Sequence, residues 1–109
     1  MGLTETPPPP YWAVVFSSLR TAGDHGYAAM AEAMESLARL QPGFLGFEHA
    51  RDESRGISVS YWRSPEAIRA WRENLEHQQA QRAGRERWYA RYQVRICKVE
   101  RAYGCEQSR

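Results

Sequence analysis

The sequence predicts an α+β fold of the ferredoxin-like βαββαβ kind, a four-stranded antiparallel sheet with two helices on one face. Three observations predict it. Four segments are rich in β-branched and aromatic residues, and two others repeat apolar residues at helical spacing. These segments follow one another in the order strand, helix, strand, strand, helix, strand. The length of 109 residues suits a single compact domain.

Residues 11–20, YWAVVFSSLR, are the first predicted strand, and both of its alternating faces are apolar. Strands of this kind are covered on both sides. We therefore expect helices over one face and a second copy of the chain over the other. After a loop with two glycines, residues 27–40 place apolar side chains three and four apart, which predicts a helix. Pro42 and Gly43 end that helix.

Residues 44–51 and 57–63 are predicted strands, joined into a hairpin by the polar turn 52–56. Ser58, Ser60 and Trp62 share one face of the second of these strands. The opposite face of the same strand is more apolar.

Ser64 is a suitable N-cap and Pro65 a suitable first residue for a second helix, which the pattern continues to residue 81. Gly84 interrupts that pattern, and a short helical turn is expected after it. Residues 90–103 alternate as a long last strand. We assign residues 1–10, with four prolines, to a disordered leader, residues 11–104 to the folded domain and residues 105–109 to a flexible tail.

The composition excludes several classes of function. With 15 basic and 13 acidic residues, the net charge of +2 does not indicate a nucleic-acid or membrane-surface partner. No apolar run approaches the roughly 20 residues of a membrane span. Cys97 and Cys105 have neither metal spacing nor the pattern of a disulfide framework, so we expect a cytoplasmic protein. We predict no metal and no cofactor, since no histidine spacing or nucleotide fingerprint is present.

Two stretches, QPGFLGFE and SYWRSPEAIRAWRENLEH, together with an arginine-rich step into the last strand, resemble the antibiotic biosynthesis monooxygenase superfamily. The resemblance covers residues 11–103. It implies a dimeric α+β barrel, in which two copies pack through their sheet faces. It also implies oxidation of a small aromatic or quinol substrate without a cofactor, in a pocket between the sheet and the helices.

The resemblance assigns roles to particular residues. Trp71 matches the helix tryptophan that lines the pocket in such proteins, and Arg91 approximates an arginine near the last strand. Haem degradation is not expected. The haem-degrading members need a histidine later on the helix, where this chain has Gln81, and an asparagine near the end of the first strand, where it has Ser17 and Ser18.

The residues themselves leave alternatives open. Trp71 suits the core as well as a pocket, and Trp62 suits a wet cavity or a dimer interface. His77 and His49 are candidate bases, because imidazole exchanges protons near neutral pH, although a histidine at a polar helix end is commonly solvated. The arginines between residues 82 and 95 are interleaved with aromatic residues, and we interpret them as a solvated junction rather than a nucleic-acid surface.

Two hypotheses follow. The first is a cofactor-independent monooxygenase with His77 or His49 as the base, Arg91 as the partner of an oxyanion, and Trp71, Trp62 and Ser17 around the substrate. The second is a non-catalytic dimeric module that binds a small hydrophobic metabolite or a protein partner. Uptake of O₂ with a hydroxylated aromatic substrate separates the two.

Overall fold

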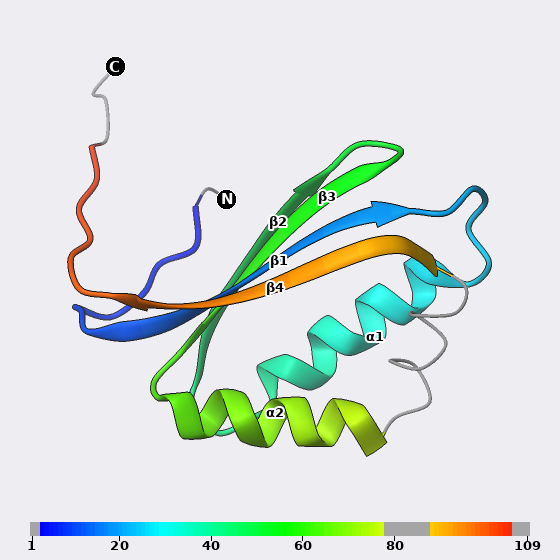
Figure 1. Cartoon of the computed structure of the whole chain (residues 1–109). Helices are drawn as coiled ribbons and strands as arrows, with labels where there is room; N and C mark the ends of the chain where they lie inside the picture. Colours follow the sequence, from blue (N-terminus) through cyan, green and yellow to red (C-terminus); the bar gives the residue numbers. More distant parts are fainter. Residues whose placement is uncertain (1–2, 78–87, 106–109) are drawn as a thin grey trace.

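A computed structural model confirms the predicted architecture (Figure 1). It describes residues 3–77 and 88–105, and the side chains of residues 76 and 77 lie outside that description. Four strands and two helices are described, in the predicted order: β1 (Tyr11–Arg20), α1 (Tyr27–Arg39), β2 (Phe44–Arg51), β3 (Arg55–Trp62), α2 (Pro65–His77) and β4 (Tyr89–Val99).

The strands form one antiparallel sheet in the order β2-β3-β1-β4, and α1 and α2 lie on the same side of it (Figure 1). Residues directly opposite each other on neighbouring strands point to the same face. Val14 lies opposite Ser60 of β3 and Ile96 of β4, and it lines the space under the helices. The even-numbered residues of β1 therefore face the helices, and the odd-numbered ones form the outer face.

Two strand boundaries differ from the prediction by more than one residue. β3 begins at Arg55 rather than residue 57, because one carboxylate oxygen of Asp52 accepts hydrogen bonds from the backbone of Ser54 and Arg55 and tightens the turn. β4 ends at Val99 rather than residue 103, since Val99 already pairs with Tyr11, where β1 begins. The predicted end of the second helix and the break at Gly84 lie outside the described residues.

The connection from β3 into α2 has the predicted cap. The Ser64 hydroxyl accepts a hydrogen bond from the backbone N–H of Ala67, at 3.1 Å. Gly43, just before β2, packs against this first helical turn with a φ of 83°. A Cβ on Gly43 would lie 2.7 Å from the Cβ of Ala67, so glycine is needed here for both its backbone angle and its small size.

The N-terminal leader contacts the sheet at two threonines. The Thr4 hydroxyl donates to the carbonyl of Phe47 at 2.7 Å, and the Thr6 hydroxyl donates to the Tyr11 hydroxyl at 2.9 Å. The leader and the C-terminal segment leave the same end of the sheet, on the side away from the helices (Figure 1). Disorder of residues 1–10 remains a prediction. No helix of the described part of the chain is long and apolar enough to span a membrane.

Candidate ligand-binding cavity

A cavity of about 590 Å³ lies between the helices and the inner face of the sheet. Its size falls in the range of roughly 300–1,000 Å³ that is usual for small-molecule sites. Apolar and aromatic side chains supply most of its wall, and they come from all four strands and both helices. A flat hydrophobic ligand is the kind of molecule that such a wall retains.

An aromatic platform forms one part of the wall. The Phe16 ring of β1 stacks on the Tyr92 ring of β4 with 5.3 Å between centroids, and it meets the Tyr89 ring edge-on at 5.4 Å. Elsewhere on the sheet's inner face, Phe47 and His49 of β2 lie with their rings 5.5 Å apart. Both pairs line the cavity. Ring faces at these positions favour stacking with an aromatic ligand.

The two tryptophans of the Ser64–Pro65 junction have different positions. Trp71 of α2 lines the cavity, whereas Trp62 at the end of β3 is fully buried behind it. Their rings stack at 6.2 Å, and the Phe44 ring meets the Trp62 ring edge-on at 5.5 Å. The Trp62 indole N–H donates to the Ser60 hydroxyl at 2.8 Å. Trp62 therefore supports the wall that Trp71 presents to the cavity.

The polar end of the cavity is centred on Arg51, the last residue of β2. Its guanidinium donates to the Tyr27 hydroxyl at 3.1 Å and to the carbonyl of Ser54 at 3.4 Å, with a longer contact of 3.5 Å to the hydroxyl of Ser18. Ser18 is buried at 4% exposure. Among the side chains that the structure describes, which exclude those of residues 76–87, no carboxylate lies within 4 Å of this guanidinium.

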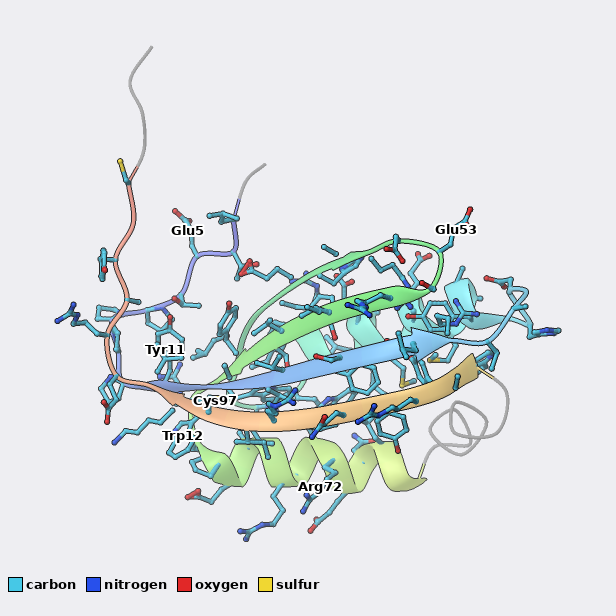
Figure 2. The ribbon with its side chains drawn as sticks, turned by 45° about the horizontal axis from the view of Figure 1, so that its top comes forward. Glu5, Tyr11, Trp12, Glu53, Arg72 and Cys97 are labelled. Carbon is cyan, nitrogen blue, oxygen red and sulfur yellow. The ribbon has the colours of Figure 1, made fainter. Side chains whose placement is uncertain are left out.

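The hairpin leaves room for that guanidinium. Arg51 pairs with Gly56 across the β2–β3 hairpin, and the arginine side chain occupies the space where a Cβ on Gly56 would stand. Any larger residue at position 56 would push the guanidinium away from this place. Figure 2 shows Glu53 at the tip of the same hairpin, pointing away from the molecule.

Tyr27, the first residue of α1, is fixed from several directions. The Arg20 guanidinium lies over its ring at 3.6 Å from the centroid, and Trp88 and Tyr89 meet the ring edge-on. Arg20 is itself held by the carbonyls of Trp88, Gly23 and Asp24.

The Tyr89 hydroxyl completes this polar end. Burial raises the pKa of Tyr89 above its usual range, and a hydrogen bond with the Tyr27 hydroxyl raises it further. Tyr89 therefore keeps its proton at neutral pH.

Comparison with known proteins identifies the family. The family profile described as antibiotic biosynthesis monooxygenase matches residues 18–83. The uncharacterised protein YqjZ of Bacillus subtilis is 54% identical over 100 residues, which cover 91% of this chain and 88% of YqjZ. The chain belongs to the antibiotic biosynthesis monooxygenase family.

Solved structures share the fold of this family member. A mutant of SnoaB, a cofactor-independent oxygenase from Streptomyces nogalater, aligns with a TM-score of 0.70 over 92% of this chain and 97% of its own, at 12% identity. PA3566 from Pseudomonas aeruginosa aligns with a TM-score of 0.65 over 94% of this chain and all of its own, at 18% identity. At these identities the likeness concerns the fold.

The structure separates the residues that the sequence singled out. Trp71 and His49 line the cavity. Neither Ser17 nor Arg91 lines the cavity. Both point to the outer face, because their chain neighbours Ser18 and Tyr92 line the cavity and successive residues of a strand face opposite sides. Trp62 is buried behind Trp71. The side chain of His77, at the end of α2, lies outside the described part of the chain.

The polar end of the cavity is formed by residues that were not among the predicted site residues, chiefly Ser18, Tyr27 and Arg51. A signal for two of them was present in the alternation of the strands. Ser18 has the same parity as Phe16, and Arg51 has the same parity as Phe47 and His49. For Tyr27, the only signal in the sequence was its position at the start of the apolar stripe of α1.

Proposed function

We propose that the protein is a cofactor-independent monooxygenase that oxidises a small aromatic or quinol substrate in the cavity. The observation that carries this proposal is an aromatic cavity of about 590 Å³ that holds both a histidine and an arginine–tyrosine group. The platform of Phe16 and Tyr92 would stack on the substrate, with Trp71 as part of the wall. Family membership and the SnoaB-like fold are consistent with this chemistry.

In the proposed reaction, His49 removes the proton of a phenolic hydroxyl, which gives a substrate anion with carbanion character at a ring carbon. That carbon transfers electrons to O₂ and forms a new C–O bond in a hydroperoxide. Protonated His49 returns its proton to the peroxide. The C–H proton on that carbon then leaves as the O–O bond breaks, so that one oxygen stays as a carbonyl and the other departs as hydroxide, which takes up the released proton to form water. Substrate is the reductant of O₂, and no further reductant is needed.

Oxygen consumption with one-, two- and three-ring hydroquinones and anthrones tests the proposal. We expect uptake that persists after treatment with a chelator, and loss of most of the rate in His49→Ala. His77→Ala is measured beside it, because His77 is the other base that the sequence suggests. His25→Asn is a matched control, since His25 is exposed and does not line the cavity, and asparagine tolerates its φ of 50°.

Two outcomes would count against the proposal. Full activity of both His49→Ala and His77→Ala would refute the assignment of the base. Ligand-dependent thermal stabilisation without O₂ uptake or product would favour the alternative, a non-catalytic module that binds a small hydrophobic metabolite.

We also propose that two copies form a homodimer through the outer faces of their sheets. Both helices lie on the other side of the sheet (Figure 1). The outer face carries apolar side chains, among them Val15, which is paired with Val59. Native mass spectrometry should give twice the mass of the chain. Val15→Asp should shift that mass to the monomer, whereas Arg69→Glu on the exposed side of α2 should not.

A further inference from the structure

We infer that the end of the cavity next to the β2–β3 hairpin binds an anionic oxygen of the ligand through the guanidinium of Arg51. The ligand class is a flat aromatic molecule that carries an acidic oxygen, as a phenolate, an enolate or a carboxylate. This inference rests on the proposed function, because it names the part of the site that would hold the substrate anion. It can nevertheless be tested by binding alone.

The charge of Arg51 is not neutralised by its described neighbours. Its hydrogen-bond acceptors are two hydroxyls and a backbone carbonyl, all of them neutral. Arginine stays protonated in proteins. Of the acids on α1 that line the cavity, Glu35 is paired with Arg39 at 2.9 Å, and Glu32 is exposed. A cation beside an apolar wall attracts an anion more strongly than it would in water.

The guanidinium is held in place before any ligand arrives. Gly56 leaves the space that it occupies, the Ser54 carbonyl accepts from one nitrogen, and the Tyr27 hydroxyl accepts from another. Tyr27 is itself fixed under the Arg20 guanidinium. A group that is already ordered loses little conformational entropy when a ligand binds, so less of the energy of its contact with the anion is offset by ordering.

The distance between Arg51 and His49 allows a single fused-ring ligand to reach both side chains. They are two residues apart on β2, and both line the cavity. Their Cα atoms are therefore about 7 Å apart along the strand. A fused aromatic molecule lying on the inner face of the sheet could meet Arg51 with its anionic oxygen while another part of the ring system lies near His49. The aromatic platform of Phe16 and Tyr92 faces the same cavity.

Binding of 2-naphthoate and its neutral isostere 2-naphthamide tests the inference in the full chain. Affinities are measured by isothermal titration calorimetry, with quenching of tryptophan fluorescence as a second readout. We expect the wild-type protein to bind the naphthoate at least about tenfold more tightly than the amide, the preference that a charge-assisted hydrogen bond gives. Arg51→Gln should reduce the preference to about twofold or less and leave the affinity for the amide almost unchanged.

Three further variants keep the test independent of folding. Gly56→Ala keeps Arg51 but places a methyl group where its side chain lies, so it should also reduce the preference. Tyr27→Phe removes the hydroxyl that orients the guanidinium and should weaken naphthoate binding alone. Arg55→Gln is the matched control, because Arg55 is exposed on the outer face of the same hairpin and should leave the preference unchanged.

The outcomes separate this inference from the proposed activity. A wild-type protein that binds neither probe, or both equally, overturns the inference, and so does a preference that survives in Arg51→Gln. If the preference for naphthoate is lost in Arg51→Gln while the wild-type protein consumes no O₂ with any hydroquinone or anthrone, the anion site is upheld and the oxygenase is refuted.

Discussion

Replacement of Trp62 by phenylalanine should destabilise the fold much more than the same change at Trp71. Trp62 has no exposed surface and packs against the rings of both Phe44 and Trp71. The smaller ring would bury roughly 50 Å² less area, which corresponds to about 1 kcal/mol. Loss of the hydrogen bond to the Ser60 hydroxyl adds about 1 kcal/mol. The space left unfilled adds up to about 1 kcal/mol more.

The expected total for Trp62→Phe is thus about 2–3 kcal/mol, a large part of the roughly 5–15 kcal/mol by which such domains are stable. Trp71 is only partly buried and lines the cavity, so Trp71→Phe should change the free energy of unfolding by less than about 1 kcal/mol. It should instead alter the affinity for an aromatic ligand.

Urea unfolding followed by far-UV circular dichroism measures both variants. We expect the midpoint of Trp62→Phe to fall well below that of the wild type with an unchanged slope, and its thermal midpoint to fall by about 8–15 °C. If Trp71→Phe proved as destabilising as Trp62→Phe, the assignment of Trp62 to support and Trp71 to the cavity surface would be wrong.

Three other predictions concern ionisation and the backbone. Burial, and a hydrogen bond to the Glu48 carboxylate, raise the pKa of Tyr61 to about 12 from an unfolded value near 10. Its contribution to stability is therefore complete below about pH 10 and is lost between about pH 10 and 12. In urea unfolding across that range, the free energy of unfolding should fall less in Tyr61→Phe than in the wild type. The backbone N–H groups of Arg55 and Ser54 lower the pKa of Asp52, so the stability that its carboxylate contributes is present above about pH 4 and is lost below. Asp52→Asn should therefore reduce the fall in the free energy of unfolding between neutral and acid pH. An unchanged fall would contradict this assignment. Gly43→Ala should destabilise the fold by more than the roughly 1–2 kcal/mol expected from its positive φ alone, because the added methyl group meets Ala67. Gly26→Ala is the control, since Gly26 has a φ of 84° and open space around it, and only the backbone effect is expected there. Thermal unfolding measures both variants.

Alternation along the strands predicted which side chains share a face, but not which face the helices cover. Both faces of β1 are apolar in sequence, so nothing local distinguishes Ser17 from Ser18. The choice is made by register with the neighbouring strands. Ser18 lies opposite Gly56 and Tyr92, whereas Ser17 lies opposite Ile57 and Gln93. The buried serine beside the cavity is therefore Ser18, one residue from the predicted one.

The arginine of the site was harder to find because its environment is made by a distant residue. In sequence, Arg51 adjoins the polar turn DESRG and has the character of an exposed turn residue. Its contact with Tyr27 joins the end of β2 to the start of α1, 24 positions away, and no periodicity predicts that contact. Arg91, which stands in an arginine-rich stretch, is exposed on the outer face instead.

The geometry of the hairpin turn and the charge in the cavity are linked. The Asp52 carboxylate holds the backbone of Ser54 and Arg55, which starts β3 at once and sets Gly56 opposite Arg51. With glycine at that position the arginine side chain lies across the sheet toward Tyr27, instead of extending into solvent as Glu53 does at the tip (Figure 2). A turn with the sequence of a simple connection thus determines where the positive charge of Arg51 lies in the cavity.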